Sequence, residues 1–491
     1  MHIDRFMTAA VSSGSGKTLI TCGLLELLKR RGLNIAAFKC GPDFIDPMFH
    51  ARVLGTKSRN LDPYFTGHDR TRMLLAKNSE GADLAVLEGV MGFYDGISPE
   101  SSEGGASDLA GITETPVLLI VPARGMSRSV LAEIRGFLDF PGGERIRGII
   151  LNRVSDSFYP VLKDMIVKET GIPVVGYVPV LDASMTLKSR HLGLVLPDEI
   201  TELKKNISRI ADLFERTMDV DKILSVASEA PDLPDQEISR TWTEVFSAAS
   251  SAAGTLTLPE SSAEKGAHNA ADPMGGTVRI GIAEDEAFCF FYEDNLELLR
   301  CLGAELVPFS PVHDRHLPED LDGLLLHGGY PELYASQLSS NAEMRQEVRA
   351  AILAGMPVQA ECGGFLYLFR ELEDMEGRKY PMAGIFPGTA YYTGHLTRFG
   401  YVELQGKGLF GGDDVPVRAH EFHYYDADDP GNDLLAVKPS GKRSWRCAHV
   451  SDTMYAGFPH LYYYAEPRIA GWFVRQCRRF HFQTEDTACI H

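Results

Sequence analysis

Residues 7–18 read Met7-Thr8-Ala9-Ala10-Val11-Ser12-Ser13-Gly14-Ser15-Gly16-Lys17-Thr18 and lie between a short apolar run and the helical pattern Leu19–Arg31. A strand, a loop of small residues and a helix that opens with Gly-Lys-Thr form a phosphate-binding loop, because loop N–H groups and the positive end of the helix dipole face phosphate oxygens. Lys17 is expected to neutralise phosphate charge, and the Thr18 hydroxyl to hold Mg²⁺. The predicted nucleotide-binding residues of this loop are Ser13, Gly14, Ser15, Gly16, Lys17 and Thr18.

The loop departs from the strict phosphate-loop pattern, which requires Gly at the position of Val11. We predict a variant loop, one residue longer, in which Gly14 and Gly16 allow the backbone to approach a phosphate closely. The alternative interpretation is an ordinary turn of small residues before a helix. The position of the Gly-Lys-Thr run between a strand and a helix favours the phosphate loop.

The composition favours a globular protein with more than one domain. With 491 residues, of which 44% are hydrophobic, two or three cores are expected. The formal net charge of −19, with no basic patch to offset it, argues against a nucleic-acid partner. No apolar run reaches the roughly 18 residues of a membrane span. The first residues also lack the basic stretch followed by an apolar stretch that is typical of a signal peptide. Eight scattered cysteines indicate reduced thiols, so we predict a cytoplasmic protein without a membrane partner.

Residues 5–220 alternate apolar runs with amphipathic stretches, which is typical of βαβ units and a parallel sheet, and we predict a first domain, which binds ATP, at residues 1–224. Such a sheet collects functional residues at the carboxyl ends of its strands. The predicted strands are Asn34–Phe38, Leu84–Leu87, Pro116–Val121, Ile146–Leu151 and Pro173–Val178. The predicted helices are Leu19–Arg31, Ser127–Phe137, Pro160–Thr170 and Glu199–Met218.

A change of composition precedes a second α/β series. Residues 225–276 are rich in Ala, Ser, Pro, Asp and Glu, and we predict a flexible linker with a candidate short helix at Ile238–Ala249. A second domain is predicted at residues 277–475 and a frayed tail at residues 476–491. The predicted fold class is therefore α/β, with two doubly wound domains. The predicted strands of the second domain are Thr277–Ala283, Glu305–Phe309, Gly323–Leu326, Pro357–Ala360, Gly400–Leu404, Val415–Ala419 and Tyr455–Gly457.

Charged side chains follow the second predicted strand directly. Lys39, Asp43 and Asp46 flank the turn Gly41-Pro42, near the phosphate loop. Close carboxylates suit Mg²⁺, which prefers oxygen ligands, and they also suit orienting a nucleophilic carboxylate or binding a cationic group. Lys39 adds positive charge for a phosphate or a substrate. The alternative is a turn with solvated acids, and the neighbouring phosphate loop makes it the weaker one.

Two further strand ends carry candidate nucleotide ligands. Glu88 ends an aliphatic strand before Gly89, and an acid beside a phosphate loop commonly carries the Mg²⁺ of the nucleotide. Asp95, in the turn that follows, is a weaker candidate for the same role. Asn152 ends another strand, where its amide is placed to read an adenine edge or to serve as an ordinary turn residue.

The second domain contains a cysteine at a predicted strand-to-helix turn, in the run Glu361-Cys362-Gly363-Gly364. A thiol on such a turn lies near a helix N-terminus and is expected to gain thiolate character. His460 is the predicted base, and N–H groups of Gly328 and Gly363 are the predicted oxyanion donors. A lone cysteine is more commonly a buried core thiol. The surrounding glycines favour the nucleophile.

His420 and His423, with Glu421 between them, invite a metal interpretation. Histidines three residues apart on a helix suit zinc, but the flanking sequence is rich in strand-forming residues and offers no third ligand. We favour a structural role or a place at the edge of a substrate site.

Together the motifs resemble the cobyrinate a,c-diamide synthase family, over about residues 3–225 and 277–475. The resemblance implies a P-loop NTPase-like domain similar to dethiobiotin synthetase, joined to a class I glutamine amidotransferase-like domain. The stretches that carry it are Lys39 through Pro47, Glu88 through Gly92, Arg190 through Leu194, Asp285 through Phe288, Tyr292 through Leu296, Glu361 through Gly364 and His420 through Tyr424.

The resemblance implies ATP- and glutamine-dependent amidation of the a and c acetates of cobyrinic acid through an acyl phosphate. ATP and Mg²⁺ are the implied cofactors, a corrinoid and L-glutamine the implied partners, and a homodimer is left open. The implied catalytic residues are Cys362, His460, Asp46 and Asp43, the metal ligands are Thr18, Glu88 and Asp46, and Lys39 and Asn152 join the nucleotide site.

Some positions depart from the family pattern. Ala10 stands where the family's loop commonly has Gly, His327 replaces a Gly, and Tyr462 replaces a His. The Glu that other class I amidotransferases carry two residues after the catalytic His is absent. A Cys–His dyad without a carboxylate predicts a poorly oriented His460, and hence a glutaminase that idles until the synthetase site is loaded.

Three other functions are considered. The same parts suit diamidation of another tetrapyrrole such as nickel-sirohydrochlorin, or the cobyric acid synthase reaction. A partition-type ATPase switch, which would not amidate, predicts ATP-dependent dimerisation and no use of glutamine. The Glu-Cys-Gly-Gly turn disfavours the switch, which has no need of a nucleophile.

Overall fold

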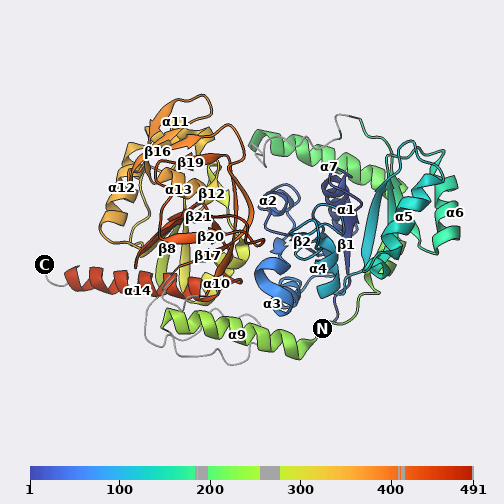
Figure 1. The fold of residues 1–491 in the computed structure, drawn as a ribbon, viewed down its shortest axis with the longest axis horizontal. Helices are drawn as coiled ribbons and strands as arrows, with labels where there is room; N and C mark the ends of the chain where they lie inside the picture. Colours follow the sequence, from blue (N-terminus) through green and yellow to red (C-terminus); the bar gives the residue numbers. More distant parts are fainter. Residues whose placement is uncertain (183–184, 186–196, 255–276, 407–409, 411–414, 489–491) are drawn as a thin grey trace. The chain divides into compact units, whose positions relative to one another are not determined.

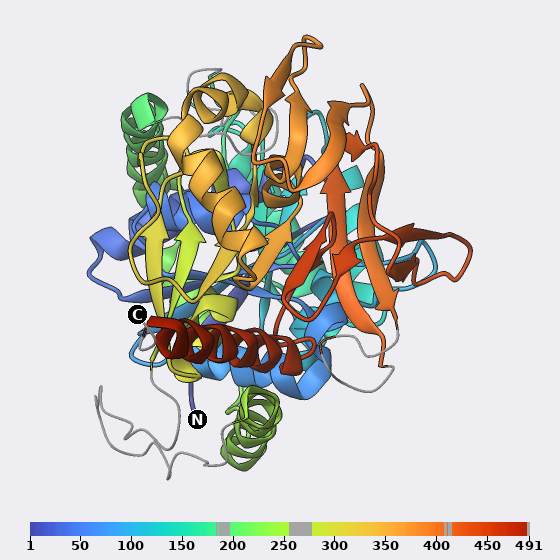
Figure 2. The same cartoon turned by 90° about the vertical axis from the view of Figure 1, so that its left-hand side faces the viewer.

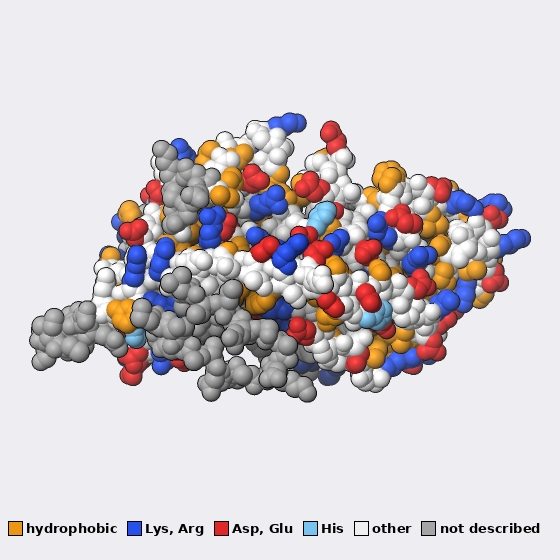
Figure 3. All heavy atoms as spheres, turned by 90° about the horizontal axis from the view of Figure 1, so that it is seen from below, with side chains coloured by type: hydrophobic (Ala, Val, Ile, Leu, Met, Phe, Trp, Pro, Cys, Tyr) orange, Lys and Arg blue, Asp and Glu red, His pale blue; other side chains and the backbone are white. Residues whose placement is uncertain are grey.

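The computed structural model describes residues 1–182, 185, 197–254, 277–406, 410 and 415–488 (Figure 1). The chain divides into two compact units, Met1–Thr241 and Trp242–His491, each with a mainly parallel sheet. Among the helices within the described ranges, none combines the length and the apolar character that a membrane crossing requires. On the face shown in Figure 3, acidic and basic side chains are interspersed over the described surface.

The first unit contains a seven-stranded sheet in the order β3-β2-β4-β1-β5-β6-β7, with every neighbouring pair parallel. Strands β1, β2 and β4 are buried along their whole length, as expected for a parallel sheet covered on both faces. Because these three strands are neighbours, the loops that follow them meet at one edge. The strands are β1 Arg5–Ala10, β2 Ile35–Cys40, β3 Ser58–Leu61, β4 Leu84–Glu88, β5 Val117–Pro122, β6 Ile146–Asn152 and β7 Val174–Val178.

The helices of this unit share a core with the sheet. Helix α1 packs against α7, and buried side chains of α1, α7 and α8 meet those of the central strands. The helices are α1 Lys17–Arg30, α2 Ile45–Arg52, α3 Pro63–Asn78, α4 Ala106–Ile112, α5 Ser129–Asp139, α6 Tyr159–Thr170, α7 Pro197–Thr217, α8 Val220–Ala227 and α9 Asp235–Ala253, the last of which continues into the second unit.

The second unit has a six-stranded sheet in the order β10-β8-β11-β13-β23-β22, parallel except for β22. Helix α14, red in Figure 2, packs against β8 and α10. The strands are β8 Val278–Ala283, β10 Ala304–Phe309, β11 Gly323–Leu326, β13 Val358–Glu361, β22 His449–Val450 and β23 Met454–Gly457. The helices are α10 Glu293–Cys301, α11 Ala335–Ser340, α12 Ala342–Leu353, α13 Gly363–Tyr367 and α14 Arg468–Ala488.

Smaller sheets extend this unit. A two-stranded sheet joins β9 Phe288–Phe290 to β12 Gly328–Gly329. Another follows the order β15-β14-β16-β19, and an antiparallel one the order β21-β20-β17-β18-β24. The strands are β14 Phe369–Glu373, β15 Lys379–Pro381, β16 Phe386–Tyr392, β17 Arg398–Gln405, β18 Val417–His423, β19 Tyr425–Ala427, β20 Leu434–Val437, β21 Ser444–Cys447 and β24 His460–Leu461.

The predicted fold class, α/β with two doubly wound domains, is confirmed. The predicted strands of the first domain lie within two residues of β2 and β4–β7. Strand β3 and helix α3 were not predicted, because Ser-Arg-Asn-Leu carries no apolar alternation and Gly67 interrupts the helical pattern with a non-helical backbone.

The described part of the predicted linker, residues 225–254, is largely helical: it contains the end of α8 and most of α9. The helix predicted at Ile238–Ala249 is confirmed within α9, and the expectation of flexibility is wrong there. Its buried residues Thr241, Val245, Ala249 and Ala253 recur every four positions, so small side chains form one packed face of the helix.

The predicted tail at residues 476–491 is likewise helical, as part of α14, through Ala488. Fraying was expected from about Arg478, and this is wrong for the start of that stretch. Arg478 Nη2 donates to the Leu302 carbonyl over 2.9 Å, and His481 Nδ1 lies 2.8 Å from Asp322 Oδ1.

Candidate functional site

The predicted phosphate loop connects the end of β1 to the start of α1. Gly16 has a φ of +94°, and a Cβ at this position would lie 2.7 Å from Asn152 Nδ2. Both the left-handed backbone and the close approach therefore require glycine at this position. Gly14 also has a positive φ, of +76°, while the Ser15 side chain is buried and Ser13 is exposed.

Asn152, at the end of β6, lies against this loop. Its Nδ2 donates a hydrogen bond to the Ser15 carbonyl over 2.8 Å, so the amide group braces the loop backbone. The adenine-reading role predicted for Asn152 stays a prediction.

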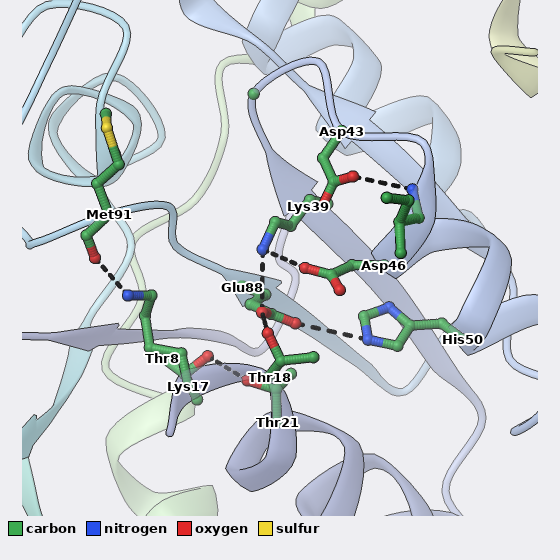
Figure 4. A network of polar contacts seen from close by, with 12 residues as sticks. Thr8, Lys17, Thr18, Thr21, Lys39, Asp43, Asp46, His50, Glu88 and Met91 are labelled. Atoms are coloured by element: carbon green, nitrogen blue, oxygen red, sulfur yellow. Dashed lines mark hydrogen bonds and ion pairs between the residues drawn. The ribbon is translucent and has the colours of Figure 1, made fainter. Parts of the chain in front are cut away.

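A buried polar cluster adjoins the start of α1, at the ends of β2 and β4 (Figure 4). Thr18 Oγ1 donates to Glu88 Oε1 over 2.7 Å, and Lys39 Nζ lies 3.0 Å from the same carboxylate oxygen. Lys39 Nζ also lies 2.5 Å from Asp46 Oδ2. His50 Nε2, on α2, lies 3.5 Å from Glu88 Oε2. Three residues predicted from separate motifs, Thr18, Lys39 and Glu88, thus meet within hydrogen-bonding distance.

The charges in this cluster are unequally stabilised. Burial disfavours the ionised form of Glu88, but the charge of Lys39 and the contacts from His50 and Thr18 outweigh it and lower the pKa of Glu88. Burial and the charge of Glu88 raise the pKa of Asp46 well above its ordinary value, against the effect of Lys39. Burial alone would lower the pKa of Lys39, but Glu88 and Asp46 raise it. The ammonium group therefore remains charged between two carboxylates.

The remaining charged candidates make local contacts. Asp43 Oδ1 accepts the backbone N–H of Ile45 over 2.9 Å, at the start of α2. Asp95 Oδ2 accepts the N–H of Gly92 over 2.8 Å. Lys17 Nζ donates to the Met91 carbonyl, and burial followed by the charge of Lys39 lowers its pKa.

In the second unit, Cys362 occupies a sharp turn between β13 and α13. Its φ of +46° is a left-handed conformation that a non-glycine residue rarely adopts, and its N–H donates to the Gly457 carbonyl over 2.8 Å. Strained backbone of this kind is common at nucleophiles. A Cβ at Gly363 would lie 2.9 Å from Gly329 N and 3.3 Å from Gly328 C, so the two predicted oxyanion loops are in close contact.

The predicted thiolate character of Cys362 is wrong for this state of the molecule. Its side chain is only 8% exposed, and burial followed by the negative charge of Glu332 raises the thiol pKa. Burial also raises the pKa of Glu332 to about 7. The position after a strand and before a helix predicted the turn, but the sequence pattern did not indicate that the thiol is covered and flanked by acids.

His460 lies on β24, opposite His420 of β18, and is buried. A Cβ at Gly328 would lie 2.6 Å from His460 Cε1, which places the imidazole beside the oxyanion loop. His460 Nδ1 lies 3.3 Å from Glu361 Oε2. A carboxylate therefore lies beside His460, although it does not come from the position two residues after the histidine. The idling glutaminase stays a prediction.

Glu361 was not predicted as a site residue, because the pattern of other class I amidotransferases places the acid after the histidine. Glu361 instead precedes Cys362, in the motif that supplies the thiol and the glycines. A buried acid at the end of an otherwise apolar strand is the signal that was available.

The His420 motif lies on strand β18, as the flanking sequence predicted, and not on a helix. His423 Nδ1 lies 2.6 Å from the Tyr425 carbonyl and its Nε2 lies 3.3 Å from Glu421 Oε2. These contacts occupy both ring nitrogens of His423. The stretch Arg190 through Leu194 lies outside the described residues.

Comparisons with known proteins assign a family to each of the two α/β regions. Residues 6–195 match the CobQ/CobB/MinD/ParA nucleotide binding domain, and residues 279–464 match the CobB/CobQ-like glutamine amidotransferase domain. The chain is 36% identical to a cobyrinate a,c-diamide synthase of Listeria innocua, over 95% of this chain and 98% of the relative. It is also 36% identical to that of Priestia megaterium, over 97% and 98%, and 35% identical to that of Caldanaerobacter subterraneus, over 97% and 98%. The chain therefore belongs to the cobyrinate a,c-diamide synthase family.

Proposed function

We propose that this protein uses ATP and glutamine to convert the a and c acetate carboxylates of cobyrinic acid to amides. The observation that carries the proposal is the presence, in one chain, of a phosphate loop with a buried Lys39–Glu88 pair and of a cysteine at a strained turn. The residue after this cysteine, Gly363, adjoins the Gly328 loop, which His460 also contacts. The phosphate loop suits activation of a carboxylate, and the cysteine suits release of ammonia from glutamine. The family membership supports the choice of substrate.

The nucleotide site would bind ATP through the loop from Ser13 to Thr18. Lys17 and Lys39 supply positive charge for phosphate oxygens. Asp43, just before α2, and Asp46, in the first turn of α2, lie where a substrate carboxylate would be oriented. Transfer of the γ-phosphoryl group to that carboxylate forms an acyl phosphate and leaves ADP.

The cluster also fits Mg²⁺. Thr18, Glu88 and Asp46 offer oxygen donors, and Glu88 Oε2 is a buried oxygen that accepts no hydrogen bond from the described residues. Bound there, the cation would neutralise charge on the phosphate oxygens.

The glutamine site would release ammonia through Cys362. His460 takes the thiol proton, the sulfur attacks the side-chain amide carbon of glutamine, and N–H groups of Gly328 and Gly363 stabilise the oxyanion. The C–N bond then breaks and ammonia leaves with the proton from His460. Water hydrolyses the thioester to glutamate, and the ammonia displaces phosphate from the acyl phosphate to give the amide.

The test is an assay of the purified protein with ATP, Mg²⁺, glutamine and cobyrinic acid, with the products identified by mass. The expected product has two carboxyls converted to amides, and the K17A variant is expected to form none. Nickel-sirohydrochlorin is offered in parallel as the alternative substrate, and preferential amidation of it would redirect the proposal. ATP hydrolysis without any amide product from either tetrapyrrole would refute the proposal.

A further inference from the structure

We propose that Glu361 is a positioning residue for glutamine hydrolysis, which holds His460 in the orientation and tautomer needed to accept the thiol proton of Cys362. In this arrangement the orienting carboxylate comes from the residue before the nucleophile, and not from a position after the histidine. The inference rests on the proposed function, because it concerns how the same site splits glutamine.

The first observation is a line of buried polar contacts that ends at His460. Tyr463 Oη donates to Gln359 Oε1 over 2.9 Å, and Gln359 Nε2 donates to Glu361 Oε1 over 2.8 Å. Glu361 Oε2 lies 3.3 Å from His460 Nδ1. Gln359 and Glu361 share one face of β13 because strand side chains alternate. Gln359 therefore fixes one carboxylate oxygen, and the other faces the imidazole.

The second observation is the burial of this carboxylate. Glu361 is 5% exposed and His460 is 2% exposed, and a buried carboxylate is costly unless it is paired. The nearby imidazole of His327 is a poor partner for it. Burial lowers the pKa of His327 to about 4, against the charge of Glu361, so this ring is neutral near pH 7. His460 is the imidazole that Glu361 contacts.

The chemical consequence concerns the two ring nitrogens of His460. Glu361 Oε2 lies within ion-pair distance of Nδ1, although the two atoms are not in hydrogen-bond geometry in this structure. A carboxylate oxygen accepts hydrogen bonds only, so on alignment of the pair it favours the proton of the neutral ring on Nδ1. Nε2 would then accept the proton of Cys362. As the thiolate attacks the amide carbon of glutamine, His460 becomes positively charged, and the negative charge of Glu361 stabilises it until the proton leaves with ammonia.

The test compares E361Q and E361D with the wild-type full-length protein, in two assays. In E361Q, Gln359 Nε2 still requires an acceptor, so the oxygen of the new amide faces Gln359 and its NH₂ group faces His460. The NH₂ group donates to Nδ1 of His460, which favours the ring proton on Nε2 of His460. The glutaminase kcat is expected to fall about 100-fold or more, as losses of this kind do in related triads, with KM for glutamine within about threefold of wild type. E361D keeps the charge and is expected to recover part of kcat. Synthesis from free ammonia is expected to be unchanged in both variants.

The matched control is E376Q, which removes an exposed carboxylate of the same unit that contacts Arg378; its glutaminase kcat is expected to equal that of wild type. The second measurement is ¹⁵N NMR of ring-labelled protein, with the H460N variant for assignment. The expected result is a proton on His460 Nδ1 in wild type and on Nε2 in E361Q. This readout would not respond to a merely structural role.

Two results would overturn the proposal: a glutaminase kcat of E361Q within about threefold of wild type, or an unchanged His460 tautomer in E361Q. A parallel fall of ammonia-dependent synthesis would also overturn it, because the substitution would then disturb the whole chain. Failure of the proposed function is distinct, since wild type itself would then form no amide from glutamine or ammonia.

Discussion

Replacing Glu88 with Gln tests whether the buried cluster serves nucleotide chemistry or only stability. Glu88 is fully buried and accepts from Thr18 Oγ1 over 2.7 Å, while Lys39 Nζ lies 3.0 Å away. At an effective dielectric constant of about 20, the attraction between Lys39 and Glu88 at that distance is about 5 kcal/mol before desolvation is subtracted.

Most of the electrostatic stabilisation that E88Q loses is recovered by other interactions in the variant. The Lys39 ammonium keeps Asp46 at 2.5 Å, and the charge of Glu88 that raises the pKa of Asp46 is gone. The neutral Gln side chain also costs less to bury than a carboxylate does. We therefore expect E88Q to lose only about 1–2 kcal/mol of unfolding free energy, the size of one hydrogen bond to a charged group.

Activity is expected to respond very differently. Loss of the Glu88 charge removes a proposed ligand of the nucleotide-bound cation, so ATP-dependent synthesis is expected to fall about 1,000-fold or more, with glutamine or with free ammonia as the nitrogen source.

The assay measures amide formation from free ammonia in wild type and E88Q, together with urea unfolding of both. The matched control is E26Q, which removes a carboxylate of α1 that contacts Arg30 and is expected to leave synthesis unchanged. Ammonia-dependent synthesis within about tenfold of wild type in E88Q would refute the reasoning, and a loss of stability above about 4 kcal/mol would show that the cluster is mainly structural.

Three other predictions follow from the same structure. C362A is expected to abolish glutamine-dependent synthesis and to retain ammonia-dependent synthesis; loss of both would contradict the assignment of the nucleophile. G16A, whose Cβ would lie 2.7 Å from Asn152 Nδ2 at a φ of +94°, is expected to weaken ATP binding at least about tenfold in a titration, and unchanged affinity would contradict the loop geometry. Because folding lowers the pKa of His327 from 6.5 to about 4, the unfolded chain takes up a proton first as the pH falls, so stability is lost between pH 6.5 and 4. H327N is expected to lose about 2 kcal/mol less than wild type between pH 7 and pH 5 in urea unfolding, and equal losses would contradict the assignment.

Much of the first unit could be predicted from local sequence. The loop of small residues before Lys17 lies between a predicted strand and a predicted helix, and this position indicates a phosphate loop. Apolar runs such as Leu84–Leu87 are long enough to specify buried parallel strands. The convergence of Thr18, Lys39 and Glu88 also followed, because Lys39 and Glu88 lie at strand ends and Thr18 begins the helix after the β1 loop, all at one edge of the sheet.

The composition gave wrong predictions of flexibility for segments whose order depends on packing against neighbouring elements. The stretch that contains α9 was predicted to be a flexible linker with a short helix at Ile238–Ala249; the helix is confirmed, but it is packed, with Val245 and Ala249 on a buried face. Short side chains carry little hydrophobic signal, yet they allow close helix packing, which becomes visible only when the neighbouring elements are in place. The tail was misjudged for the same reason, since Cys477 lies in a packed helix.

The sequence by itself determined that this protein has a phosphate loop, a cysteine at a strand-to-helix turn and two α/β domains, because each of these follows from the spacing of neighbouring residues. Only the tertiary structure decided that Glu361 faces His460, that the Cys362 thiol is covered, and that Asn152 braces the loop. These contacts join residues far apart in the chain, and they depend on strand order and burial, which no local pattern encodes.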